Sequence, residues 1–221
     1  GGVVKEAVVT PSPLQDVVDK LASMLDGEQT LEIVDAAHAR AVIERSLRQV
    51  IPRVKDHPAL HSVCLSNEPI SVDLSKCRIT AKAWPAWLER RHGTVATLNA
   101  RWGTAHADFA AIPVPKPEFN ETPACLDFVR FNSETFAAFH RWMADVVHSM
   151  APELPAHAKI MMGAHFQRTL HGFWSVDPEA FTALSQYNGN DAYNMYDKDG
   201  TQWINGWRHC QAGYDFQRSM S

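Results

Sequence analysis

The sequence predicts an α/β protein built on parallel strands, either an open sheet or a barrel. From about residue 31, helical and strand-like patterns alternate in the order helix, strand, helical segment, helix, strand, helix, strand. The strand-like runs are short and apolar, and amphipathic helices separate them. This alternation is typical of parallel sheets, because each helix returns the chain to the edge where the next strand begins.

Composition limits the classes of protein and partner. The chain has 221 residues, of which 45% are hydrophobic and 21% charged, so it is long enough to bury a sizeable core. A net charge of -4 without any run of Lys or Arg argues against nucleic acid or anionic membrane as a partner. No apolar stretch in the sequence is long enough to predict a membrane span. Four dispersed cysteines and a beginning unlike a signal peptide favour a cytoplasmic location.

The N-terminal third predicts four elements. Residues 3–9 have the pattern of a short strand, and apolar residues at helical spacing follow over 14–25. Asp35 is placed to cap a second helix, which Pro52 is expected to bend or end. A strand is then predicted over 62–65, with Cys64 as a small core residue.

A long excursion separates this strand from the next one. Two helices are predicted, divided by Gly93, and a loop containing four prolines then precedes a strong helix. The tryptophans of the two helices are expected to serve packing. The predicted elements after the first strand are helices 83–91 and 95–102, loop 103–125, helix 127–150, strand 158–163, helix 178–185 and strand 189–193.

Two stretches carry a resemblance to a known family. The letters SNEP, Ser66 to Pro69, end the predicted strand as the acid/base strand ends in clan A glycoside hydrolases. The segment HGTVATLNARWGT, which ends at Thr104, and the helix LDFVRFNSETFAAFHRWMADVVHSMAPELP, which begins at Leu126, resemble family 42 β-galactosidases. The resemblance covers about residues 31–221. One departure is Pro69, because family 42 members more usually follow Asn-Glu with Tyr-Gly.

The resemblance implies an incomplete (β/α)8 TIM-type barrel. Residues 1–221 would form part of a glycoside hydrolase catalytic barrel, roughly strands three to six, and residues 70–125 a helical and Pro-rich insertion after strand four. The family's nucleophile is a second glutamate at the end of strand seven. No Glu follows Glu179 in this sequence, so we expect the nucleophile to be missing and this chain alone to be inactive.

Glu68 is the candidate general acid/base of a retaining β-glycosidase, similar to a β-galactosidase. It lies where a strand must end, since Pro69 lacks the donor that a central ladder needs. Catalytic groups of a barrel lie at the carboxyl ends of its strands. Asn67 is a candidate to hydrogen-bond the sugar 2-OH. The alternative is an acidic strand end in a surface loop.

Four further residues are candidates for substrate binding. His165 and Trp174 follow the predicted strand 158–163, on the same face as Glu68. His165 is the candidate to hydrogen-bond sugar hydroxyls, and Trp174 is the candidate to stack on a sugar ring. Tyr193 and Asn194 end the next strand, and in clan A a Tyr there often hydrogen-bonds the nucleophile. The alternatives are a loop histidine without a role, a tryptophan that covers the core and a tyrosine that merely ends a strand.

Cofactors and partners follow from the same patterns. The eleven histidines are dispersed, several of them, including His140, on helix faces, and no metal-ligand spacing is present. No nucleotide-binding motif occurs, so we expect neither a metal nor a cofactor. The expected partners are a carbohydrate and a second copy of the chain, as a homo-oligomer or domain-swapped dimer that closes the partial barrel. The alternative function is a non-catalytic carbohydrate-binding or self-associating structural fragment.

Overall fold

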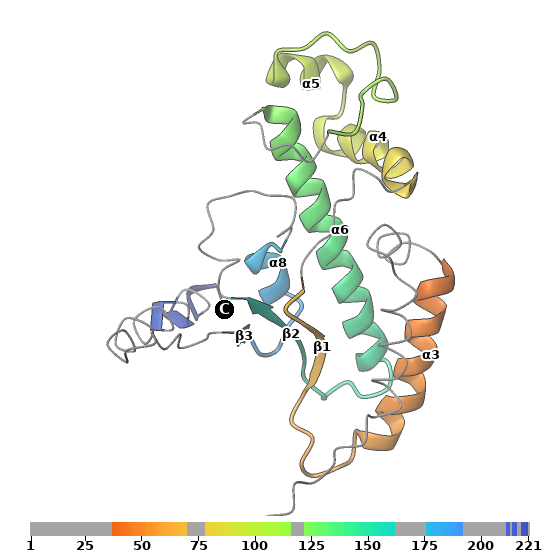
Figure 1. Cartoon of the computed structure of the whole chain (residues 1–221), viewed down its shortest axis with the longest axis vertical. Helices are drawn as coiled ribbons and strands as arrows, with labels where there is room; N and C mark the ends of the chain where they lie inside the picture. Colours follow the sequence, from red (N-terminus) through yellow and green to blue (C-terminus); the bar gives the residue numbers. More distant parts are fainter. Residues whose placement is uncertain are drawn as a thin grey trace, which may run out of the picture.

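The computed structural model describes residues 37–69, 78–115, 122–161 and 176–191, with short helical pieces at 211–212, 214–215 and 218–220. A parallel sheet lies against helices, and one long helix extends beyond the sheet to two further helices (Figure 1). The α/β class is therefore as the sequence predicts. The predicted elements within residues 1–36 lie outside the described part of the chain.

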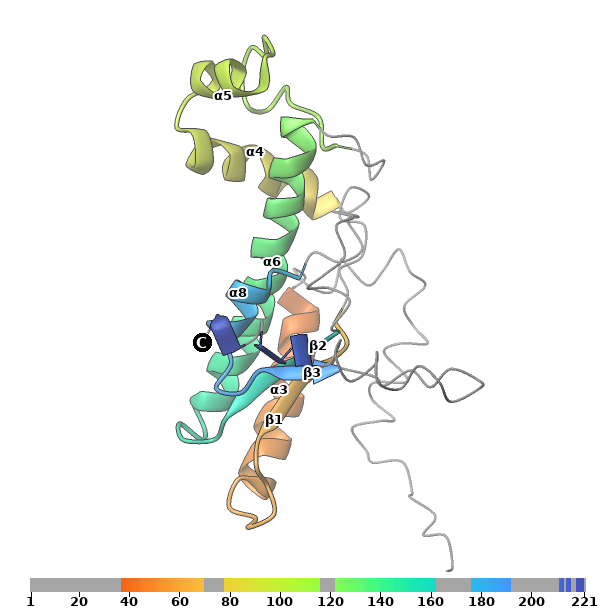
Figure 2. The same ribbon diagram turned by 90° about the vertical axis from the view of Figure 1, so that its left-hand side faces the viewer.

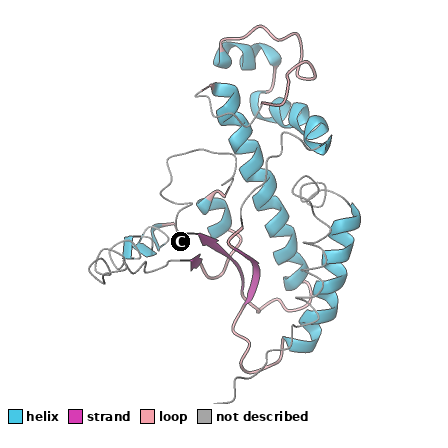
Figure 3. Cartoon of the chain, viewed as in Figure 1, coloured by secondary structure: helices cyan, strands magenta, loops and turns pink. Residues whose placement is uncertain are grey.

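The described sheet consists of three parallel strands in chain order. They are β1 (Val63–Asn67), β2 (Ala156–Met161) and β3 (Gly189–Asp191), with β2 in the centre (Figure 3). Each crossover contains helix, as parallel neighbours require. The carboxyl ends of the three strands therefore share one edge of the sheet.

Strand β1 contains a β-bulge, which is uncommon between parallel strands. Cys64 pairs with His157 and Ser66 pairs with Ala158, so Leu65 is an extra residue without a partner in β2. Leu65 and Ser66 both contact the helix side, and Cys64 lies exposed on the other face. The expectation that Cys64 belongs to the core is therefore wrong, because the helices cover only one face of this strand.

Three helices cover that face of the sheet, as the two views at right angles show (Figure 2). They are α3 (Ala37–Val54), α6 (Pro123–His148) and α8 (Pro178–Thr182). α3 and α6 pack beside each other under β1 and β2. The buried residues here form two clusters: Ile51, Val147, Ala151 and Leu154, and Ala137, Ala158, Ile160, Val176, Phe181 and Leu184.

The long helix α6 begins earlier than its apolar pattern predicts. The Thr122 side chain accepts a hydrogen bond from the Cys125 backbone N–H, and Pro123 occupies the first turn, where its missing N–H costs nothing. The last residues of the predicted loop 103–125 are thus helical. The helix pattern begins only at Asp127 because the first turn is largely exposed and carries little periodicity.

Two helices, α4 (Arg78–His92) and α5 (Val95–Trp102), pack against the far end of α6 (Figure 1). α5 matches its prediction, with Thr94 as N-cap and Gly103 in the left-handed conformation after its end. α4 begins five residues earlier than predicted and continues through Pro85. The aromatic cluster between the three helices outweighs the hydrogen bond that a proline removes.

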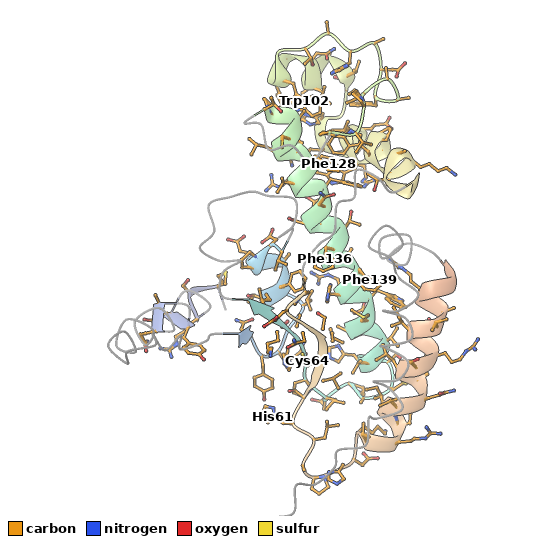
Figure 4. All side chains as sticks on the ribbon, viewed as in Figure 1. His61, Cys64, Trp102, Phe128, Phe136 and Phe139 are labelled. Atoms are coloured by element: carbon orange, nitrogen blue, oxygen red, sulfur yellow. The ribbon has the colours of Figure 1, made fainter. Side chains whose placement is uncertain are left out.

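That cluster confirms the prediction that the tryptophans of the two helices pack in the protein interior. Trp84 is completely buried, stacks on Trp87 at 5.4 Å and meets Phe128 edge-on at 5.5 Å. Trp102 is half-buried against the same cluster; Figure 4 labels it near the top of the molecule with Phe128 below it. Aromatic pairs at these distances stabilise beyond the area they bury.

A buried carboxylate ties the same three helices together. Asp127 accepts hydrogen bonds from Arg91 Nε at 2.6 Å, His92 Nε2 at 2.8 Å and Trp102 Nε1 at 2.9 Å. The donors come from α4 and α5 and the acceptor from α6. A buried carboxylate needs such partners, since an unpaired one is costly.

The remaining boundaries differ by a few residues from the predictions. α3 passes Pro52 and ends at Val54, because a proline in the last turn removes only one hydrogen bond. β1 begins one residue later and ends two residues later than the predicted strand 62–65, and α8 ends at Thr182 rather than at residue 185. The parts of strands 158–163 and 189–193 beyond Met161 and Asp191 lie outside the described residues.

Candidate functional site

The candidate acid/base residue, Glu68, directly follows β1 at the carboxyl edge of the sheet. Its backbone N–H donates to the Lys159 carbonyl of β2 at 2.8 Å, so this residue still belongs to the ladder. Its φ is 47°, and among the described residues no other non-glycine residue has a positive φ. Such a conformation costs a residue with a Cβ roughly 1–2 kcal/mol.

Pro69 restricts the backbone of the residue before it. Pro69 is buried and disfavours the right-handed helical conformation for Glu68. The strand must nevertheless end here, because Pro69 has no N–H to donate. Left-handed non-glycine residues persist only where their surroundings hold them, and they concentrate at functional sites.

The bulge decides which face Asn67 occupies. Asn67 pairs with Lys159, which lies between Ala158 and Ile160, two residues that are buried against the helices. Side chains alternate along a strand, so Lys159 and Asn67 share the open face. Without the bulge, regular alternation from Cys64 would place Leu65 toward the helices, Ser66 on the open face and Asn67 toward the helices. Asn67 is exposed, as a residue that meets a soluble ligand must be.

A hydrogen bond joins the same stretch of β1 to α6. Ser66 Oγ lies 2.8 Å from Nε2 of His140, and His140 Nδ1 lies 3.0 Å from the Phe136 carbonyl oxygen. A carbonyl only accepts, so Nδ1 carries the proton. Burial lowers the pKa of His140 from 6.5 to about 4, and the Phe136 carbonyl opposes that shift in part. The neutral ring therefore accepts the hydrogen bond that Ser66 donates.

The sequence gives little warning of this contact. His140 lies on the buried side of the helix pattern, and nothing in the pattern separates it from the other dispersed histidines. The pairing with Ser66 spans 74 positions. Only the approach of α6 to the bulged strand brings the two residues together.

A second histidine lies on the open face, toward the amino ends of the strands. His157 pairs with Cys64, and its Nδ1 is buried without a hydrogen-bond partner in the described part of the chain. Burial, and then the charge of His61, lower the pKa of His157. His61 in turn lies 4.8 Å from the ring of Tyr187, and Figure 4 labels it near the lower end of the strands. This end is opposite Glu68.

The other predicted site residues, His165, Trp174, Tyr193 and Asn194, lie outside the described residues. The strands that precede them are described, and both end at the same edge as Glu68. A surface hollow at the start of α8 is lined by Asp177, Pro178, Glu179, Ser219 and Met220 and contains none of the predicted site residues. Within the described ranges, no group of three or more His, Cys, Asp or Glu residues is arranged to hold a metal ion. No described helix has the length and apolarity that crossing a membrane requires.

Two curated relatives of this chain are named β-galactosidases. A β-galactosidase from Arthrobacter sp is 32% identical over 139 residues, which are 59% of this chain and 20% of that protein. A β-galactosidase from Geobacillus kaustophilus is 30% identical over 128 residues, which are 54% of this chain and 19% of that protein. The chain thus spans about a fifth of the length of these curated relatives.

Solved structures show the same fold. The E323A catalytic mutant of Gan42B, a GH42 β-galactosidase from G. stearothermophilus, has a TM-score of 0.70 and 22% identity over 85% of this chain and 28% of its own. The apo exo-carrageenase GH42 from Bacteroides ovatus has a TM-score of 0.67 and 22% identity, with the same coverage of both chains.

The family model of glycoside hydrolase family 42, described as β-galactosidase, matches residues 22–219. This match includes the bulged strand, Glu68 at its end and the helices that hold it. The chain belongs to the family 42 glycoside hydrolases.

Proposed function

We propose that Glu68 is the general acid/base of a retaining β-glycosidase that acts on β-galactosides. The observation that carries this proposal is the left-handed backbone of Glu68 at the carboxyl edge of a parallel sheet, held by the bond to Lys159. A carboxylate there can donate a proton to the leaving oxygen and later accept one from water. We take the β-galactoside as substrate from the relatives, which are named β-galactosidases.

The proposed chemistry needs a second carboxylate. In retaining glycosidases the two carboxyl groups lie about 5–5.5 Å apart, and the second attacks the anomeric carbon. We propose that the nucleophile lies outside these 221 residues, since the chain covers only 20% of the Arthrobacter relative. In this arrangement β1, β2 and β3 correspond to barrel strands four, five and six.

The remaining site residues have proposed roles in binding. Asn67, on the open face beside Glu68, donates to the sugar 2-OH, a contact that strengthens in the transition state. His165 and Trp174 follow β2 in the chain and would donate to hydroxyls and stack on a ring. Tyr193 and Asn194 follow β3, and Tyr193 would hydrogen-bond the nucleophile.

The open face of the sheet needs a cover. The buried clusters that involve the described strands lie on the helix side of the sheet, while Cys64 and Asn67 on the other face are exposed. We propose that further barrel strands cover this face, and that in the isolated chain a second copy takes their place, by association or by exchange of elements.

The acid/base role is tested by Glu68→Gln in the complete protein. With a nitrophenyl β-galactoside, whose leaving group needs little protonation, kcat/KM falls less than with lactose, which needs a protonated leaving oxygen. We expect a loss of roughly 10²–10⁴-fold with lactose, the range for general acid catalysis. Glu153→Gln is the matched control, because Glu153 is exposed just before β2, at the opposite end of the sheet.

The same variants separate the alternatives. If Glu68→Gln hydrolyses both substrates like the unchanged protein, the proposed role is wrong. If the protein binds galactosides without hydrolysis and Trp174→Ala weakens binding more than Glu68→Gln, it is a carbohydrate-binding module. If neither change affects binding or turnover, the chain is a structural fragment.

A further inference from the structure

The surroundings of His140 are built for a neutral ring in one orientation. Its side chain is 2% exposed and lies between Phe136, Phe139 and Phe181, with ring centroids at 4.6, 5.7 and 4.8 Å. Figure 4 labels Phe136 and Phe139 on the part of α6 beside the strands. The hydrogen bond to the Phe136 carbonyl fixes the tautomer, so Nε2 presents a lone pair to the strand.

The residue that uses this lone pair belongs to the bulge. Leu65 and Ser66 both turn toward the helices, and only Ser66 is polar. Leu65 packs against apolar residues, a contact that a strand shifted by one position could also make. The Ser66 hydroxyl needs an acceptor on the helix side, and His140 supplies it at 2.8 Å. The hydrogen bond therefore selects the bulged register.

The register in turn determines the face that Asn67 presents. A shift of one position in a strand moves every side chain to the other face. In the bulged register Asn67 lies on the open face, and the Glu68 N–H reaches the Lys159 carbonyl. In the regular register Asn67 would turn toward the helices.

We propose that His140 is a positioning residue, whose hydrogen bond from Ser66 holds the bulge in β1 and so directs Asn67 and Glu68 toward the substrate. This inference rests on the proposed function of Glu68. His140 itself touches no reacting atom; it acts through Ser66 and the backbone of β1.

A double-mutant cycle in the complete protein tests this role. Ser66→Ala leaves the buried His140 without its donor, and His140→Phe leaves the partly buried Ser66 hydroxyl without its acceptor, whereas the double variant replaces both by apolar groups and recovers thermal stability. A positioning role predicts that kcat is roughly 10–100-fold below that of the unchanged protein in all three variants, since a displaced catalytic group costs about that much. Ser66→Thr keeps the hydroxyl and retains kcat.

Hydrogen exchange provides a readout that does not depend on activity. The Glu68 amide, bonded to Lys159, should exchange at least about tenfold faster in all three variants, because the register is no longer held. Ser46→Ala is the control: Ser46 donates to Val42 within α3, so its loss removes a similar bond away from the sheet.

The outcomes separate the two claims. Recovery of kcat together with stability in the double variant, or unchanged Glu68 exchange in the single variants, overturns the positioning role and leaves His140 a purely structural residue. Full activity of Glu68→Gln in the same assay overturns the acid/base proposal, and the positioning role with it. In that case, hydrogen exchange of the Glu68 amide still shows whether the hydrogen bond between Ser66 and His140 holds the bulge.

Discussion

Glu68 combines a strained backbone with a position at the sheet edge where parallel α/β proteins place their chemistry. The strain is a cost that a surface residue without a role has no reason to retain. Asn67 and Ser66 before it occupy opposite faces of the strand, one exposed and one bonded to α6. Three successive residues thus have three different environments, although in the sequence they form one short polar run.

The strain at Glu68 can be measured by comparing two variants. Glu68→Gln keeps the unfavourable φ of 47°, whereas Glu68→Asn introduces a residue that tolerates the left-handed region, and both remove the same charge. We expect the free energy of unfolding of the Asn variant to exceed that of the Gln variant by about 0.5–1 kcal/mol. Urea denaturation measures the difference. Equal stabilities, or a more stable Gln variant, would show that the backbone is not strained.

His140 should make the stability of the protein depend on pH. Its pKa is lowered to about 4 in the folded state by burial, while the unfolded value is 6.5. The unfolded chain therefore binds more protons between these values, and stability is present above pH 6.5 and lost as pH falls through 4. The loss amounts to at most about 3 kcal/mol.

The comparison with His140→Phe isolates this effect from the carboxylates that titrate in the same range. Urea unfolding at several pH values should give a shallower decline for the variant than for the unchanged protein between pH 6.5 and 4. Parallel curves would mean that the ring is not buried in its neutral form.

At the scale of elements, the strands are placed by close backbone contacts as well as by apolar burial. β3 begins at Gly189, where a Cβ atom would lie 2.7 Å from Cδ2 of His157 and 2.9 Å from both the Ala158 carbonyl oxygen and Lys159 Cα. Two of these atoms belong to the backbone of β2. The short strand β3 therefore approaches β2 so closely that only glycine fits at its first residue.

Gly189→Ala should weaken the pairing of β2 with β3. The added methyl group meets backbone that cannot move aside, so we expect a loss of about 1–3 kcal/mol in the free energy of unfolding. Gly103→Ala is the control, because its Cβ would meet nothing within 4 Å and only its φ of 70° opposes the change. Faster amide exchange in β3 should accompany Gly189→Ala and be absent from the control. The same exchange in both variants would contradict a steric cause.

At the scale of the whole molecule, the helices divide their tasks. α3, α6 and α8 cover one face of the sheet, and the far end of α6 carries α4 and α5 with their own aromatic cluster (Figures 1 and 2). One helix therefore spans two cores. The face of the sheet away from these helices exposes Cys64 and Asn67, which is the basis for proposing that more protein covers it.

The 221-residue chain by itself should associate and hydrolyse little or no galactoside. An uncovered parallel sheet presents unpaired edges, so we expect dimers or larger species in sedimentation velocity at micromolar concentration. Cys64→Lys places a charge on the open face and should weaken association, whereas Ala138→Lys, at an exposed position on α6, should not. A stable, well-folded monomer of the unchanged chain would contradict the proposed cover.

The sequence by itself determines the class of fold, the order of most elements and the position of Glu68 at a strand end. These follow from local causes: apolar periodicity, the Thr94 cap with Gly103, and a proline that ends a strand. Tertiary structure alone decides the bulge at Leu65, the exposure of Cys64 and the bond between Ser66 and His140. Each of these depends on how two segments far apart in the sequence pack against each other, and the residues of one segment do not indicate which residues of the other they will contact.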